Sequence, residues 1–150
     1  MDAQTELDGF IDKFTPEVAA LTRALLEKAR ARVPGATILV YDNYNALAIG
    51  FGPNDKAGQA ILSLAVMRRW VTLCFLWGVH LADPHKLLKG DGSRVRHVRL
   101  HRPEDFDDPR IDALIAEALE KAGHPIDPGA AQQLVIKSIS AKQRPRRPRA

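Results

Sequence analysis

The sequence predicts an α+β fold, with a single antiparallel β-sheet of about five or six strands and N- and C-terminal helices packed on one of its faces. Two observations predict it. Apolar residues recur every three or four positions near the beginning and end of the chain, whereas the middle holds β-branched and aromatic runs separated by short turns. Short links between successive strands favour antiparallel pairing, because parallel neighbours need a long crossover. A chain of 150 residues is long enough to form one such domain.

Three helices are expected. Apolar side chains follow helical spacing over residues 5–14. Thr15 is suited to cap a second helix, which should end near Val33 because a Pro-Gly pair follows. Asp108 is suited to cap a third helix, which should end at Gly123.

Six strands are expected from the remaining apolar runs. They are residues 37–41, 46–51, 60–66, 71–77, 94–100 and, as a less regular edge strand, 132–140. The run from Trp70 to Trp77 is apolar on both faces, which is typical of a central strand. Val95 falls out of phase with Val98 and Leu100, which indicates a β-bulge in the fifth strand.

Composition excludes several classes of protein. With 45% hydrophobic and 27% charged residues, the chain is not expected to be disordered, collagen-like or a coiled-coil rod. No run of eighteen apolar residues occurs, so no membrane partner is expected. The single Cys74 cannot form an internal disulfide, and no basic, apolar leader begins the sequence. We therefore expect a cytoplasmic protein.

The excess of basic over acidic residues lies at the C-terminal end of the chain. The formal net charge is +4, yet residues 1–127 hold sixteen Lys and Arg against eighteen Asp and Glu. Residues 141–150 contain two prolines and no large apolar side chain, so the sequence predicts a disordered tail after a domain at residues 1–140. The tail could bind nucleic-acid phosphates without sequence specificity, or it could only keep the protein soluble. It lacks aromatic residues for stacking on bases. Its bases are Lys142, Arg144, Arg146, Arg147 and Arg149.

A glycine-rich connection follows the fourth strand. Gly90-Asp91-Gly92-Ser93 could expose successive backbone N–H groups to an anion, with nearby bases adding positive charge. Alternatively, the glycines only permit tight turns and an aspartate bonds the backbone. The connection lacks the Gly-Lys-Ser/Thr ending of a P-loop, so nucleotide hydrolysis is not indicated. The candidate residues for a small anionic ligand are Asp83, Lys86, Lys89, Gly90, Gly92, Arg94 and Arg96.

The segment 70–98 carries a family resemblance. It combines an apolar strand, a glycine, the sequence L-A-D-P at 81–84, the sequence L-L-K-G-D-G at 87–92 and a basic strand. This ordered pattern resembles the YdhG-like domain family, and the order of elements over residues 17–123 fits that family too. The resemblance implies an α+β domain of largely unknown biochemical function. One branch of the family is similar to a frataxin-like intracellular iron chaperone, so iron is the cofactor or cargo that the resemblance implies.

Four carboxylates precede the third helix. Glu104, Asp105, Asp107 and Asp108 could hold a hard cation such as iron at an exposed surface. Alternatively, these acids cap the free N–H groups of the helix and complement the positive end of its dipole. Their spacing is not that of an EF-hand loop.

Histidines give a second possible metal site. His80, Asp83 and His85 place three potential ligands in six residues, and His97 and His101 would share one strand face if no bulge intervenes. The alternative is that the histidines are simply solvated and that Asp83 stabilises a turn.

Aromatic and thiol groups have both functional and structural interpretations. Tyr41, Tyr44 and Trp77 could line a small-molecule cleft, where a neighbouring Arg96 would favour a planar anion, or they could fill the core and turns. Cys74 lies in an apolar strand with no histidine adjacent in sequence, which favours a packed structural thiol.

These observations favour a non-enzymatic module that binds or carries a small ligand, and iron is the cargo that the family resemblance alone implies. The first alternative is a nucleic-acid-associated accessory protein that binds phosphates through the basic tail. The second alternative is an enzyme that uses the same cleft. No catalytic triad or acid/base pair stands out, and the oligomeric state is not indicated.

Overall fold

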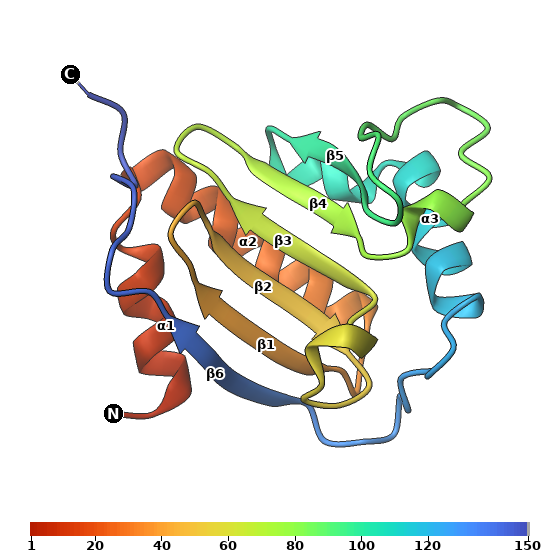
Figure 1. The fold of residues 1–150 in the computed structure, drawn as a ribbon, viewed down its shortest axis with the longest axis horizontal. Coiled ribbons are helices and arrows are strands. Elements are labelled where there is room, and N and C mark those ends of the chain that lie inside the picture. The colour runs from red at the N-terminus through yellow and green to blue at the C-terminus, as the bar shows by residue number, and fades with distance from the viewer. Residues whose placement is uncertain (150) are drawn as a thin grey trace.

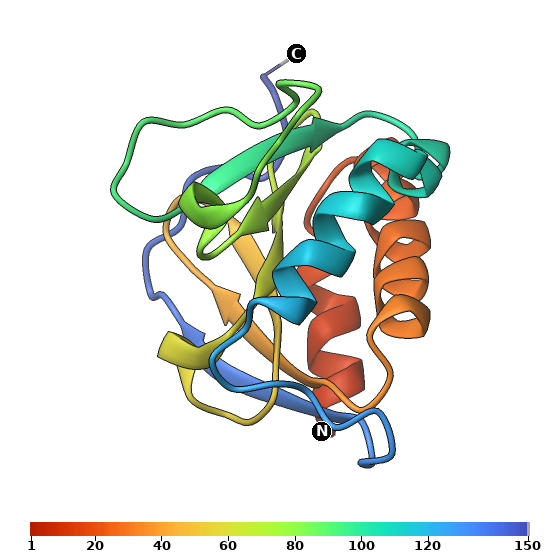
Figure 2. The same ribbon diagram turned by 90° about the vertical axis from the view of Figure 1, so that its right-hand side faces the viewer.

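The computed structural model describes residues 1–149 and confirms the predicted α+β class. Three α-helices lie on one side of a six-stranded sheet (Figures 1 and 2). The helices are α1 (Ala3–Ile11), α2 (Pro16–Arg32) and α3 (Pro109–Glu120). The strands are β1 (Thr37–Asp42), β2 (Leu47–Gly52), β3 (Leu62–Val66), β4 (Val71–Phe75), β5 (Arg96–Leu100) and β6 (Gln133–Ile139). Short 3₁₀ helices are η1 (Ala57–Gln59), η2 (Gly78–His80) and η3 (Pro103–Asp107).

The sheet has the strand order β5-β4-β3-β2-β1-β6. Pairings from β1 through β5 are antiparallel, as predicted, and β6 is an edge strand, as predicted. The prediction of a wholly antiparallel sheet is wrong for β6, which pairs parallel to β1. The physical reason is that α3 and the segment after it carry the chain back from the β5 edge to the β1 edge, which supplies the crossover that a parallel pair needs.

The predicted bulge in the fifth strand is absent. β5 pairs with β4 in unbroken register from Arg96 to Leu100, and Val95 lies before the strand begins. The register shift of this sheet instead lies between Val40 and Tyr41, where β1 pairs with β6.

Side-chain caps begin the helices near the predicted positions. The Thr15 hydroxyl accepts a hydrogen bond from the Val18 backbone N–H at 3.3 Å, and α2 ends at Arg32. The Asp108 carboxylate accepts one from the Arg110 backbone N–H at 2.9 Å. These bonds satisfy N–H groups that the helix itself leaves free.

The apolar core lies between the helices and the sheet. Val71, Leu73 and Phe75 of β4 are buried in it, whereas Thr72 and Cys74 point to the other face, following the two-residue period of a strand. β4 is an interior strand, as its apolar run predicted. Burying a side chain such as Phe75 stabilises the fold by about 1.5–3 kcal/mol.

The antiparallel register gives the sheet two distinct ends. Asp42 pairs with Leu47, Val66 with Val71, and Val71 with Leu100, so the β1–β2 turn, the β3–β4 turn and the end of β5 lie at one end, which we call the turn end. The C-terminal segment also runs there (Figure 1). The opposite end, which carries η1, η2 and the last turn of α3, is called the loop end.

Within residues 1–149, no helix combines the length and the apolar character required to cross a bilayer.

Candidate functional site

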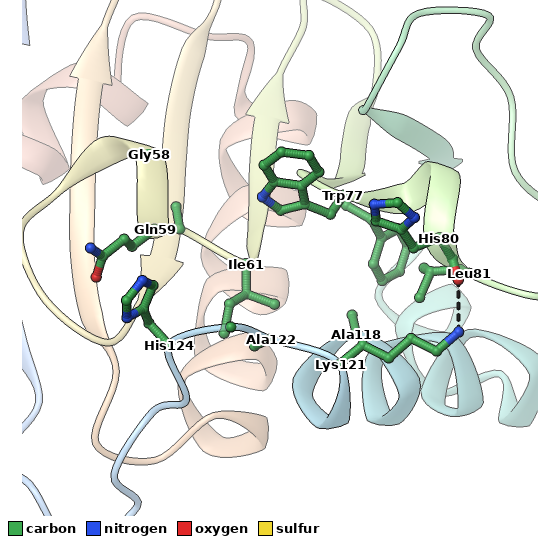
Figure 3. A pocket seen from close by; sticks show the side chains of 13 residues that line it. Gly58, Gln59, Ile61, Trp77, His80, Leu81, Ala118, Lys121, Ala122 and His124 are labelled. Carbon is green, nitrogen blue, oxygen red and sulfur yellow. Dashed lines mark hydrogen bonds between the residues drawn. The ribbon is translucent and has the colours of Figure 1, made fainter.

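An apolar pocket of about 360 Å³ lies at the loop end. It is enclosed by η1, the end of β4, η2 and the C-terminal turn of α3, as Figure 3 shows. Ile61, Phe75, Leu81 and Ala118 contribute much of its apolar lining. The pocket therefore joins segments that are far apart in the chain, and it forms only when the fold is complete.

Polar groups stand on two sides of this pocket. Gln59 and His124 lie on one side, and His80 and Lys121 lie on the other (Figure 3). The Lys121 ammonium donates to the His80 carbonyl oxygen at 2.8 Å, and it pairs with Glu117 at 2.7 Å. Within residues 1–149, neither imidazole donates or accepts a hydrogen bond, so both rings are available to a ligand.

Trp77 stands at the mouth of the pocket with 47% of its surface exposed. Its ring stacks on His80 with centroids 5.9 Å apart and planes 12° apart. The Arg94 guanidinium lies 5.0 Å from the Trp77 ring centroid. The tryptophan therefore contacts two polar side chains, and a large part of its apolar surface lies outside the core.

The glycine-rich connection uses its polar groups internally. Asp83, at φ 45°, accepts hydrogen bonds from the backbone N–H groups of Leu87 at 2.9 Å and Leu88 at 3.0 Å. The Arg96 guanidinium donates to the carbonyl oxygens of Gly92 at 2.7 Å and Val95 at 2.8 Å. Both candidate residues therefore stabilise the loop conformation, which is the structural alternative considered for Asp83.

The remaining anion candidates in this connection do not converge on the pocket. Lys86, Lys89 and Arg94 are exposed, and the Lys89 backbone forms a bridge with His97. Gly90 has φ 118°, a conformation that favours glycine. Leu81, at the beginning of the connection, is the part that lines the pocket.

The four carboxylates before α3 have other partners. Asp105 accepts from the backbone N–H groups of His101 and Arg102, and Asp107 pairs with Lys28 at 2.7 Å. Burial opposes ionisation of Asp105, but those backbone hydrogen bonds hold its pKa below the usual value. Glu104 is exposed.

Asp108 acts as the cap of α3. Side-chain and backbone hydrogen bonds from Arg110 lower the pKa of Asp108 to about 2. Within residues 1–149, no group of three or more His, Cys, Asp and Glu side chains is placed to hold a metal ion. The structure thus brings neither the acids at Glu104, Asp105, Asp107 and Asp108 nor the histidines together as a metal site, because capping and ion pairing take up most of the carboxylates.

The C-terminal segment differs from the predicted disordered tail. The Arg146 side chain is only 5% exposed and lies 2.9 Å from the fully buried Asp42 carboxylate, and it also donates to the Asn43 carbonyl oxygen. Lys13 holds the other Asp42 oxygen at 2.7 Å. A buried carboxylate requires cationic partners, and Arg146 reaches it from a segment that offers no apolar anchor of its own.

Other tail bases also lie along the body. The Arg144 backbone N–H donates to the Tyr44 carbonyl oxygen at 2.8 Å, and Arg147 donates to the carbonyl oxygens of Lys13 and Asp12. Lys142 and Arg149 are exposed. Ala150 lies outside the described residues.

The remaining candidates lie outside the pocket. The Tyr41 hydroxyl is buried and has no hydrogen-bond partner among residues 1–149, and burial raises its pKa, while Tyr44 lies at the turn end. His97 lies directly opposite Cys74 in the β4–β5 pairing, a neighbour that sequence spacing could not show. Burial nevertheless raises the pKa of the Cys74 thiol, which agrees with a packed structural role.

Two pocket residues were candidates from sequence: Trp77 for lining a cleft, and His80 as a possible metal ligand. Gln59, Lys121 and His124 were missed, because each lies in a different loop or helix turn and no local pattern links them. For these three residues the sequence carried no local signal.

Comparisons with protein-family models, curated proteins and solved structures give no match to this chain. The YdhG-like resemblance therefore stays a prediction.

Proposed function

We propose that this protein is a non-catalytic binding module for a small, mostly apolar molecule that carries an aromatic ring, and that the pocket at the loop end holds it. The observation that carries the proposal is an apolar pocket of about 360 Å³ with the exposed Trp77 at its mouth. Small-molecule sites commonly have volumes of about 300–1,000 Å³, with apolar linings and a few polar groups.

The lining groups define the chemistry of the ligand. Ile61 and Ala118 would contact apolar atoms, and the exposed part of the Trp77 indole would contact an aromatic ring. Gln59 and His124 would give hydrogen bonds to a polar substituent at the other side. The Lys121 charge is already paired with Glu117, so a strongly charged ligand is not required.

Iron carriage, which the family resemblance implies, has no ligand cluster to support it within residues 1–149. The proposal is therefore for an organic ligand. Carriage through the glycine-rich connection is likewise less well supported than the pocket, since Asp83 and Arg96 are bonded within that connection.

Saturation-transfer NMR with indole, benzoate and cyclohexanol as separate probes tests the proposal. We expect indole to give the strongest signal. Ala118→Phe, which fills the pocket from α3, should abolish it, whereas Ala116→Phe, on the exposed side of the same helix, should not.

Trp77→Ala provides a second test, with Trp70→Ala at the turn end as its matched control. The first should weaken indole binding at least about fivefold, a loss expected for one aromatic stack. Absence of any probe signal, or equal signals from all four variants, would show that the pocket is not a ligand site.

A further inference from the structure

The turn end gathers basic residues from three separate parts of the chain. Arg68 and Arg69 lie in the β3–β4 turn, Arg99 lies near the end of β5, and Arg144 lies in the C-terminal segment beside the β1–β2 turn. All four side chains are exposed. Figure 1 shows the two turns and the C-terminal segment together at the upper left of the sheet.

Their positive charge is not neutralised within the described residues. None of these four guanidinium groups forms an ion pair with residues 1–149. The neighbouring acids are already engaged: Lys13 and Arg146 hold Asp42, Arg102 pairs with Asp105, and Arg23 pairs with Asp12. The surface is thus a source of positive potential that a partner with phosphates could use.

Two aromatic rings lie among these charges. The Arg99 guanidinium is 3.9 Å from the Trp70 ring centroid, and the Arg144 guanidinium is 5.6 Å from that of Tyr44, which is 47% exposed. Thr72 accepts a hydrogen bond from the Trp70 indole N–H at 3.1 Å, which fixes this ring against the sheet face opposite the helices. Aromatic rings and guanidinium planes both stack on bases.

The separation of the two turns suits a short single strand. The β1–β2 and β3–β4 turns are two strand spacings apart, or about 10 Å. Phosphates of a stacked single strand repeat at about 3.4 Å, so about three nucleotides would cross from one turn to the other.

We propose that the turn end binds single-stranded nucleic acid, with Arg68, Arg69 and Arg144 contacting phosphates, Tyr44 stacking on one base, and the Arg99 guanidinium that covers Trp70 stacking on another. This site differs from one formed by the tail alone, because Arg146 is paired with Asp42 and the aromatic rings come from the folded body. It is also separate from the pocket, which lies at the opposite end of the sheet.

Fluorescence anisotropy with a labelled oligothymidylate of about 15 nucleotides tests the proposal, with duplex DNA and inorganic polyphosphate as competitors. We expect the single strand to bind more tightly than the duplex, and the logarithm of its affinity to fall with the logarithm of salt with a slope of about −2 for three phosphate contacts.

Two pairs of variants locate the site. Arg68→Ser with Arg69→Ser should weaken oligothymidylate binding about tenfold, whereas Lys89→Ser with Arg94→Ser removes the same charge from the glycine-rich connection and should have little effect. Tyr44→Ala should weaken the oligothymidylate about fivefold or more without changing polyphosphate binding, because polyphosphate has no base to stack.

Three results would each overturn the proposal: no binding of oligothymidylate, equal losses in the two double variants, or an unchanged oligothymidylate affinity in Tyr44→Ala. Binding to vesicles rich in phosphatidylserine but not to oligothymidylate would likewise replace it with an anionic lipid surface.

Discussion

The turn end and the loop end complete the same sheet in opposite ways. At the turn end, a buried carboxylate, Asp42, is enclosed by the cationic side chains of Lys13 and Arg146. At the loop end, apolar side chains surround an open pocket and Trp77 remains half exposed. The first end is closed by charge pairing from a distant segment, and the second leaves apolar surface exposed.

The difference shows how a basic segment can be structural. Arg146 lies among prolines and bases, yet it is among the few buried charged residues of the chain. A charge removed from water requires a partner on site, so the Asp42–Arg146 contact holds the segment to the body more specifically than apolar contacts could.

Arg146→Ala should cause the largest loss of stability at the turn end. Removing one partner leaves the buried Asp42 carboxylate under-compensated, and we expect the free energy of unfolding to fall by about 3–5 kcal/mol. Urea unfolding measures it. The control is Lys142→Ala, an exposed base of the same segment, which should change stability by less than about 0.5 kcal/mol. Similar losses in both variants would mean that the buried pair is not special.

Gly78→Ala tests the loop end in the same assay. An added Cβ would stand 2.5 Å from the Arg96 Cβ and 2.8 Å from the Arg96 backbone nitrogen, so η2 must move away from β5. We expect a loss of about 1–3 kcal/mol, as for other overpacked sites. Gly58→Ala, where nothing lies within 4 Å, is the control, and a loss there of equal size would contradict this explanation.

Acid should weaken the turn end selectively. Burial acts to raise the pKa of Asp42, but hydrogen bonds from Lys13, Gln143 and Arg146 outweigh it and hold this pKa below its usual value of 3.8. The stability that ionised Asp42 contributes is therefore present above about pH 4 and is lost as the pH falls below 3.8 towards the lower pKa of the folded state. The stability difference between wild type and Arg146→Ala should narrow over this range. A constant difference from pH 7 to pH 3 would refute the assignment.

Arg99→Ala is expected to have the smallest effect. Loss of the guanidinium from the Trp70 face should cost about 0.5–1 kcal/mol, the usual size of an exposed cation–π contact. Thermal or urea unfolding measures the difference against Arg68→Ala, since Arg68 has no cation–π contact within residues 1–149. Equal stability of these two variants would show that the contact contributes nothing.

Local patterns predicted most of the elements. Helical spacing and the caps Thr15 and Asp108 located α2 and α3, and apolar runs located all six strands. These signals are local, because caps, turns and periodicity involve residues a few positions apart. The parallel direction of β6 depends on the path of the chain after α3, which no local pattern specifies.

Long-range pairing explains what the sequence did not predict. Arg146 and Asp42 lie more than a hundred positions apart, so sequence patterns could not reveal their contact. The disorder of the tail was therefore predicted from its prolines and charges alone. The pocket likewise draws Gln59 and Lys121 from opposite halves of the chain. For Trp77 the sequence left a cleft and the core as alternatives, and the structure places the half-exposed side chain at the mouth of the pocket.

The parallel pairing of β6 with β1 also indicates the order in which parts of the protein fold. Strands β1 to β4 are joined by short turns, whereas Thr37 of β1 meets Gln133 of β6 only after a very long loop closes. We expect β6 and the Arg146 contact to form after the transition state for folding. Arg146→Ala should therefore speed unfolding and leave the folding rate nearly unchanged in stopped-flow experiments. Slowed folding would contradict this order. The C-terminal segment would then set the lifetime of the folded protein, while the β1–β4 meander sets how quickly it forms.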